Sequence, residues 1–192
     1  MARQSIYNIQ KIIQFIPLTD GYRLNDFCCG ITQYDDFLKN EALILQEYGV
    51  SKVHLLINKE NADIIAYMTL SADVIRLTYE EMESYDMSSI PFKAIPAVKI
   101  GHLAVDEKYR QRYKNIGSLM IELARGLCVE MRERGIACRF ITVDADVTNN
   151  PTVCDFYLKN GFKYNVDYKK RVNPSLRLDI DGSFEEVKED LA

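Results

Sequence analysis

A strand–helix–strand pattern over residues 98–144 limits the folds open to this chain more than any other feature. Residues 100–105 and 138–144 are runs of β-forming side chains, and the segment between them repeats apolar residues at helical spacing up to Gly135. Two strands joined by a helix lie parallel, with a right-handed crossover, and ligands bind outside their carboxyl ends. The apolar face of the helix comprises Ile116, Leu119, Met120, Leu123, Ala124, Leu127, Cys128 and Met131.

The rest of the chain alternates strands and helices without internal repeats. The periodicity predicts, in order, strand 12–18, helix 34–45 closed by Gly49, strands 53–58 and 64–72, and two short strands within 165–180. Together with the 98–144 unit they indicate a mixed α+β fold. With 192 residues and 47% hydrophobic composition, the chain can bury a full core, and we expect a single domain over residues 1–180.

The end of the chain is strongly acidic. Residues 179–192 hold six acidic side chains and one lysine, a net charge of −5, whereas the whole chain carries −4. By subtraction, residues 1–178 carry +1. Blocks of like charge are usually solvated, so we expect residues 181–192 to form an acidic tail outside the domain.

A basic turn over residues 106–115 joins strand 100–105 to the long helix. A turn that feeds a helix leaves several backbone N–H groups unpaired, and the helix dipole adds about half a positive charge there. Phosphates bind at such places. The turn supplies four cations: Lys108, Arg110, Arg112 and Lys114. The pattern therefore predicts an anion site, although a merely solvated helix start has the same pattern.

The residues around this turn resemble motif A of the GNAT superfamily of acyl-CoA-dependent N-acyltransferases. In that motif a strand ending in Val-Asp precedes Tyr-Gln/Arg and a Gly-rich turn that holds the CoA pyrophosphate. Val105-Asp106, Tyr109-Arg110 and Ile116-Gly117-Ser118-Leu119 match. The middle departs, with two extra residues before Gly117 and Asn115 in place of a glycine. Because Asn tolerates positive φ better than other non-glycine residues, we expect the turn to persist.

Residues 150–162 resemble motif B of the same superfamily, Asn-Pro-x-Ala-x-x-Phe-Tyr-x-Lys-x-Gly-Phe. The local chemistry agrees, since Asn150 suits a helix N-cap, Pro151 suits the first helical position and Asn160-Gly161 suits a helix end. Two motifs in the right order and spacing are far more specific than one. The resemblance covers residues 14–179.

The resemblance implies the GNAT fold: a mixed, mostly antiparallel central sheet with a parallel pair splayed apart at the acyl-CoA site, and helices on both faces. It also implies acetyl-CoA as cosubstrate. The implied CoA contacts are the backbones of Leu103 and Val105, the turn residues Arg110, Arg112, Lys114, Asn115, Ile116, Gly117 and Ser118, and Asn150 and Tyr157.

Three side chains are candidates for the chemistry. Tyr157 matches the tyrosine that protonates the leaving CoA thiolate in the superfamily; a phenol, with a pKa near 10 against about 8.5 for a thiol, stays neutral at pH 7 and can donate. A plain core aromatic is the alternative. His102 is either a structural histidine or a base or substrate contact. Cys154 fits a buried helix cysteine better than an acyl-accepting nucleophile.

The acceptor is inferred from a missing group. Some GNAT enzymes that acetylate proteins carry a glutamate base on the central strand, and Lys99 occupies that position here. A lysine amine with a pKa near 10.4 is neutral about once in a few thousand molecules at pH 7, whereas an α-amine near 8 is neutral about one time in ten. The sequence therefore favours an N-acetyltransferase acting on a weakly basic primary amine of a small molecule or peptide.

Two alternatives stay open. One is a likeness to GNAT toxins that acetylate the α-amine of aminoacyl-tRNA, carried by Phe27-Cys28-Cys29-Gly30, Asp36-Phe37-Leu38, Thr69-Leu70-Ser71-Ala72 and His102-Leu103-Ala104-Val105-Asp106. We rank tRNA below a small acceptor, because residues 1–178 carry only +1 and RNA binding needs several clustered cations. The other is a catalytically idle CoA-binding module, against which the intact Asn150 and Tyr157 argue.

Composition also excludes some classes of protein. No apolar run approaches the roughly 20 residues that span a membrane, and the first residues lack the apolar core of a secretion signal. The five cysteines form no CxxC pair, which suits reduced thiols in a cytoplasm. Because only two histidines are present, we expect no His/Cys metal site. We expect a cytoplasmic monomer or homodimer.

Overall fold

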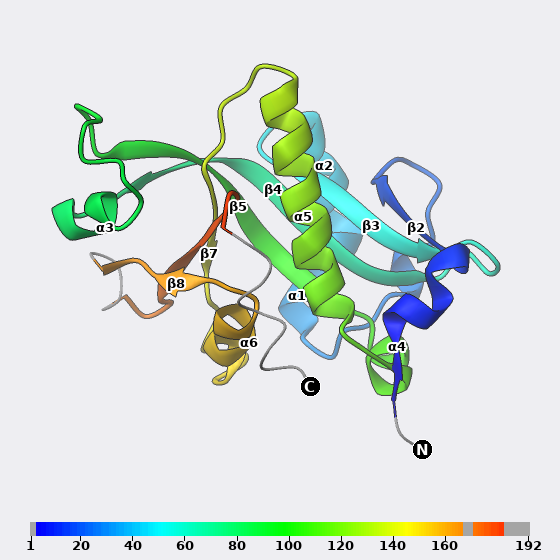
Figure 1. Ribbon diagram of the computed structural model, residues 1–192. Coiled ribbons are helices and arrows are strands. Elements are labelled where there is room, and N and C mark those ends of the chain that lie inside the picture. The colour runs from blue at the N-terminus through cyan, green and yellow to red at the C-terminus, as the bar shows by residue number, and fades with distance from the viewer. Residues whose placement is uncertain (1–2, 167–170, 183–192) are drawn as a thin grey trace. The chain divides into compact units, whose positions relative to one another are not determined.

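The computed structural model describes residues 3–166 and 171–182 (Figure 1). The chain divides into two compact units. Unit 1 contains residues 1–71 and 100–123, and unit 2 contains residues 72–99 and 124–192. Three long elements run from one unit into the other along the chain: β4 (Ile64–Arg76), β5 (Ala94–Val105) and α5 (Ile116–Glu133).

Seven strands pair in the order β2-β3-β4-β5-β7-β9-β8. The pairs β2–β3, β3–β4, β7–β9 and β8–β9 are antiparallel. Between the neighbours β5 and β7 the chain passes through α5, which is the helical crossover expected between residues 98 and 144. The mixed, mostly antiparallel sheet is confirmed. The strands not yet bounded are β2 (Ile13–Pro17), β3 (Lys52–Asn58), β7 (Phe140–Asp144), β8 (Lys163–Tyr164) and β9 (Ser175–Asp179).

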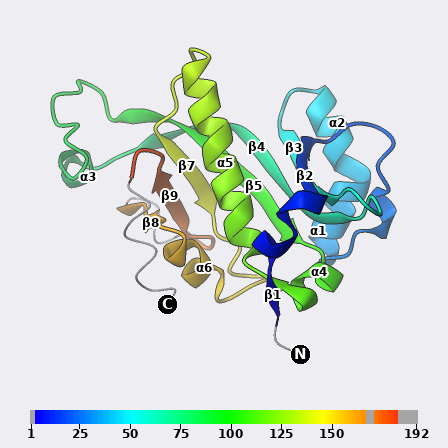
Figure 2. The ribbon, with the colours of Figure 1, turned by 45° about the vertical axis from the view of Figure 1, so that its right-hand side comes forward.

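In unit 1, one continuous helical stretch covers a face of the sheet. It comprises α1 (Thr32–Asp36), a π-helical turn η3 (Phe37–Glu41) and α2 (Ala42–Glu47). Its buried residues Phe37, Leu38 and Ala42 belong to the same apolar cluster as alternate residues of β3. The views show the start of α5 on the opposite face (Figures 1 and 2). Gly49 ends the stretch at φ +69°, as the sequence predicts.

A second, very short sheet lies apart from the seven strands. It pairs β1 (Gln4–Ser5) with β6 (Tyr113–Lys114) in parallel, and no sequence pattern indicated it. Two 3₁₀ turns, η1 (Ile6–Ile12) and η2 (Leu24–Asp26), flank β2. All of these residues belong to unit 1.

Two local expectations were wrong. Residues 107–112 are a short helix, α4 (Glu107–Arg112), because the Asp106 carboxylate accepts a hydrogen bond from the Lys108 N–H at 3.0 Å and starts a helix in the expected turn. Helix α6 (Val153–Lys159) begins later than motif B suggests. The Asn150 side chain accepts from the N–H of Thr152 at 3.2 Å, which closes a turn before the helix in place of an N-cap.

Arginines hold the end of the described chain within unit 2. Asp181 accepts hydrogen bonds from Arg132, at 2.5 Å, and from Arg139. The Arg125 guanidinium donates to the carbonyl oxygens of Ile180 and Gly182. The first two residues of the expected acidic tail are therefore bound, and residues 183–192 lie outside the described part of the chain.

A buried ion pair is central to unit 2. Arg177, on β9, is 4% exposed and donates to Glu81 of α3 (Tyr79–Glu83) at 2.6 Å, where the Glu81 side chain is 7% exposed. The guanidinium also donates to the Asn165 side chain at 2.9 Å and to the Tyr85 hydroxyl at 3.1 Å. Glu81 in turn accepts from the Thr78 N–H, completing a capping box. Each charge is therefore compensated by several partners.

Removing one charge of this pair should destabilise the protein strongly, because the other would remain buried and unpaired. We expect Arg177→Met to lower the free energy of unfolding by about 3–5 kcal/mol in urea denaturation. Arg134→Met is the matched control: Arg134 pairs with Glu130, but the two side chains are 76% and 50% exposed. That variant should stay within about 1 kcal/mol of the parent. Equal effects of the two substitutions would contradict a stabilising role for the buried pair.

Candidate active site

The carboxyl end of β5 is tied to the loop that precedes α1. Asp106, which is 7% exposed, accepts from the Cys28 N–H at 3.1 Å, and the Glu107 N–H donates to the Cys28 carbonyl at 2.8 Å. One residue further on, the Cys29 N–H donates to Asp35 of α1 at 2.8 Å. These hydrogen bonds join the Phe-Cys-Cys-Gly segment to the Val-Asp end of β5 within unit 1, although the two are far apart in sequence.

The turn before α5, residues 113–118, is shorter than the turn that the sequence predicts, because residues 107–112 form α4. After α4 ends, Tyr113 and Lys114 form β6, and Asn115 adopts φ +68° directly before α5 begins. The left-handed conformation expected of Asn115 is confirmed. The Leu119 N–H donates to the Asn115 carbonyl at 3.0 Å. The N–H groups of Ile116 to Ser118 precede that first helical donor, so they have no acceptor within the helix and point out of its end.

Two of the four expected cations are already occupied within unit 1. Lys108 lies 2.6 Å from Asp63, and Arg110 lies 3.7 Å from Glu107 and donates to the Cys29 carbonyl at 3.4 Å. Within residues 3–166 and 171–182, Arg112 and Lys114 are in no ion pair, and both are exposed. They are the cations best available to an anion at the helix start.

Asp63, the partner of Lys108, accepts hydrogen bonds from several side chains. It also accepts from the Tyr109 hydroxyl at 3.1 Å and from Arg23 at 3.4 Å. The hydrogen bond from Lys108 is the main reason that the pKa of Asp63 lies below its ordinary value. A cavity of about 240 Å³ opens beside these side chains. Tyr109, which is 3% exposed, therefore has a structural role in the motif.

His102 lies in an aromatic cluster of unit 1. Its ring stacks on Phe37 at a centroid distance of 3.8 Å and meets Tyr34 edge-on at 5.3 Å. Its Nδ1 lies 3.4 Å from the Thr69 hydroxyl, which also accepts from the His102 N–H at 2.8 Å. A Cβ at Gly101 would lie 2.8 Å from that hydroxyl, so only glycine fits there. These contacts support the structural interpretation of His102.

The strand residues expected to pair with CoA lie beside His102. Leu103 and Val105 are half-buried in β5, and Ala104 between them is buried. The alternation is that of a strand with one face in the core.

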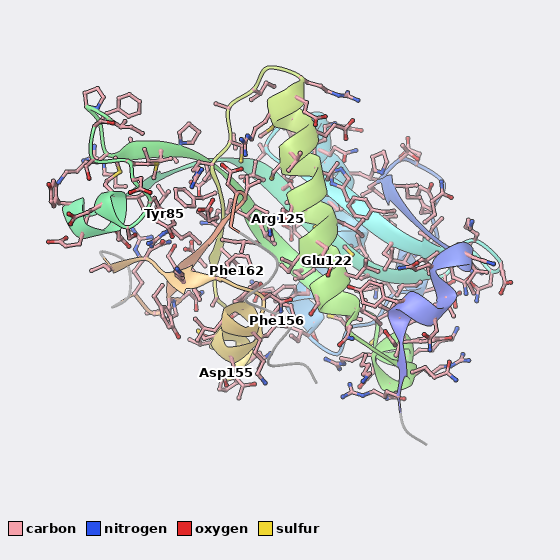
Figure 3. The ribbon with its side chains drawn as sticks, viewed as in Figure 1. Tyr85, Glu122, Arg125, Asp155, Phe156 and Phe162 are labelled. Carbon is pink, nitrogen blue, oxygen red and sulfur yellow. The ribbon has the colours of Figure 1, made fainter. Side chains whose placement is uncertain are left out.

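Tyr157 is buried on α6 in unit 2, with 6% of its surface exposed. Its ring meets Phe156 and Phe162 edge-on, each at 5.1 Å. These two phenylalanines are labelled in Figure 3. The Phe162 N–H donates to the Tyr157 carbonyl at 3.1 Å, which fixes the end of the helix. Cys154, one turn earlier, is half-buried, and a hydrogen bond with it raises the pKa of Tyr164.

Sequence reasoning missed a carboxylate next to Lys99. Asp144, the last residue of β7, lies 2.5 Å from the Lys99 Nζ, with the two side chains about one-third exposed. Two residues earlier on β7, the Thr142 hydroxyl donates to Asp73 at 2.5 Å. No sequence signal could have found these pairs, because only the strand register of unit 2 brings them together. Lys99 is therefore engaged in an ion pair with a carboxylate of β7.

Two further findings concern the described residues. No group of three or more His, Cys, Asp or Glu side chains in that part of the chain is placed to hold a metal ion. No helix there is long and apolar enough to cross a membrane.

Comparison with known proteins identifies the fold. No family model matches the sequence. Among solved structures, AtaT complexed with acetyl-methionyl-tRNAfMet superposes with a TM-score of 0.72 and 19% identity, covering 94% of this chain and 99% of AtaT. A tyrosine-to-phenylalanine mutant of KacT gives the same four values. AtaTR bound with acetyl-CoA gives a TM-score of 0.70 and 20% identity, covering 95% of this chain and all of the other. The chain has the GNAT fold that the two motifs predict.

Proposed function

We propose that this protein is an acetyl-CoA-dependent N-acetyltransferase whose acceptor is the α-amine of an aminoacyl-tRNA. The observation that carries the proposal is a likeness over nearly the whole length of both chains to AtaT, whose structure holds an acetylated aminoacyl-tRNA. Other similar structures hold acetyl-CoA, among them an AtaT mutant toxin bound to part of the antitoxin AtaR. The comparisons favour the acceptor that the sequence ranked second.

The turn before α5 supports the acetyl-CoA half of the proposal. Its outward N–H groups and the helix dipole suit a pyrophosphate, and Arg112 and Lys114 add charge that no described carboxylate neutralises. Gly117 and Ser118 expose backbone at the first turn of the helix. We assign the CoA contacts to these residues, with Arg110 as a less available cation, and to Leu103, Val105 and Asn150.

The chemistry requires a neutral amine and a proton for the thiolate. The amine nitrogen attacks the thioester carbonyl, the C–S bond breaks, the amine proton passes to solvent, and the Tyr157 hydroxyl donates a proton to the departing sulfur. A phenol is a weaker acid than a thiol, so Tyr157 reaches this step neutral and regains its proton from water. Lys99 is paired with Asp144, so it supplies no base, and an α-amine needs none because enough of it is neutral at pH 7.

The net charge of only +1 on residues 1–178 is weak evidence against tRNA as the acceptor. RNA affinity depends on cations clustered at the contact, not on the total over a chain. Within unit 1 the exposed Arg112 and Lys114 stand together beside the turn, while the negative charge of Asp63 is neutralised by Lys108 and Arg23. A free amino acid or peptide remains the second candidate, because the argument from Lys99 applies to any α-amine.

The acceptor is tested by a panel assay with radiolabelled acetyl-CoA. We expect transfer to charged tRNA, weakening steeply as salt rises from about 50 to about 200 mM because phosphate contacts release counterions. Uncharged tRNA and lysine peptides should accept nothing. Efficient, salt-insensitive acetylation of free amino acids or peptides would support the second candidate, and absence of transfer to every amine would indicate an idle CoA-binding module.

Gly117→Asp should weaken CoA binding without unfolding the protein. The new carboxylate would face the phosphates at the first turn of α5, where an acidic residue otherwise favours the helix. We expect the affinity for CoA in calorimetry to fall by at least about tenfold, since one repulsive charge contributes about 1.4 kcal/mol or more in a partly buried site.

The matched control for that substitution is Gly126→Asp, on the same helix. A Cβ at Gly126 would meet no neighbouring atom within 4 Å, and the residue lies nine positions further along the chain. The substitution adds the same charge and should leave CoA affinity unchanged. Unchanged affinity in a folded Gly117→Asp protein would remove this turn from the CoA site.

Tyr157→Phe should lower kcat by about 100-fold or more with little change in acetyl-CoA affinity, because the ring stays and only the proton donor is lost. Tyr85→Phe, which removes a half-buried hydroxyl elsewhere in unit 2, is the control and should keep kcat. Full activity of the Tyr157→Phe variant, measured by single-turnover transfer, would exclude Tyr157 as the general acid.

A further inference from the structure

The N-terminal arm, residues 3–12, contacts the turn before α5 (residues 113–118) directly. Strand β1 pairs in parallel with β6, in the register Gln4 opposite Tyr113 and Ser5 opposite Lys114. In Figure 2, β1 lies beside α4 at the start of α5. The two residues of β6 are the only ones between the end of α4 and Asn115. The arm therefore holds the segment of the turn that departs from the glycine-rich motif.

The arm is anchored on both sides of this pairing. Ile6, the next residue after β1, is fully buried. The Tyr7 hydroxyl donates to Glu122 of α5 at 2.9 Å, and burial together with that carboxylate raises the pKa of Tyr7. The Arg3 guanidinium donates to the Arg110 carbonyl in α4 at 3.4 Å. The arm thus contacts α4, β6 and α5, the three successive elements that shape the turn.

The turn has reasons to need such support. It carries two residues more than the motif, and Asn115 holds a positive φ that costs a non-glycine residue conformational energy. Lys114 and Asn115 are exposed, so the core does not fix them. A strand neighbour supplies backbone hydrogen bonds that order the segment before any ligand arrives, and ordering in advance lowers the entropy lost on binding.

We propose that the N-terminal arm is a positioning element of the acyl-CoA site, holding the turn before α5 in its binding conformation through the β1–β6 ladder. The inference rests on the proposed function, since it names a further determinant of the same site. The arm acts through Tyr113, Lys114 and Asn115 and touches no reacting atom. Loss of the ladder should therefore weaken acetyl-CoA binding and leave the chemical step unchanged.

The experiment removes the ladder and keeps the side chains of the turn. Gln4→Pro/Ser5→Pro, made in the full chain, deletes both N–H groups that β1 can donate; Ser5 already has φ −70°, which proline shares. The control Gln4→Ala/Ser5→Ala changes the same side chains and keeps the N–H groups. We expect about a tenfold rise in the Kd for CoA and in the KM for acetyl-CoA with the proline variant, kcat within about twofold, and parental values for the control.

A second readout needs no ligand. Amide hydrogen exchange of residues 113–118 should quicken by at least about tenfold in the proline variant alone, while the β3–β4 ladder exchanges as in the parent. A chain lacking residues 2–5, which keeps the buried Ile6, should behave like the proline variant. Unchanged exchange and CoA affinity in folded variants would overturn the positioning role. Failure of the parent protein to bind CoA would instead overturn the proposed function, even if the exchange result held.

Discussion

The two hydrogen bonds accepted by the buried Asp106 carboxylate are the interactions on which the region around the end of β5 depends. Asp106 lies where β5 ends, and it accepts from the N–H of Lys108 and from the N–H of Cys28. The first bond starts α4, and the second holds the loop before α1 against the strand end. Without these bonds a buried charge would be left uncompensated, which is costly, so the carboxylate enforces both connections. The direction in which the chain approaches α5 follows from them.

Electrostatic pairing then divides the cations of this region by role. Lys108 neutralises Asp63 and keeps the turn between β3 and β4 closed, while Arg110 bonds to its own helix and to the loop before α1. Arg112 and Lys114 are left exposed at the helix start. A count of basic residues would treat the four as equal. Their partners distinguish them: Lys108 and Arg110 are paired within unit 1, whereas Arg112 and Lys114 are in no ion pair with another described residue.

The turn before α5 shows how a left-handed backbone conformation is kept where the motif's glycine is replaced. Glycines allow a turn to adopt positive φ and close approach without help from outside. In this chain Asn115 adopts the positive φ, and the extra length is absorbed by α4 and by the two-residue strand β6. Strand β1 pairs with β6 directly before Asn115. The start of α5 is therefore preceded by the left-handed Asn115 and by a segment that pairs with the distant strand β1.

The sequence by itself determined the elements whose causes are local. Helical periodicity and the position of Gly135 predicted α5, and the positive φ of Gly135 at the helix end is confirmed. The tolerance of asparagine for positive φ predicted the left-handed conformation of Asn115. The two motifs identified the GNAT fold because their order and spacing are specific. The boundaries of the elements next to these motifs were predicted less well, because Asp106 and Asn150 bond to nearby N–H groups in ways that composition does not reveal.

Only the tertiary structure decided the contacts between distant segments. They are the pairing of β1 with β6 and the ion pairs Asp144–Lys99, Asp63–Lys108 and Glu81–Arg177. Each of them depends on strand register or on loop packing, and neither leaves a periodic signal in the residues that it brings together.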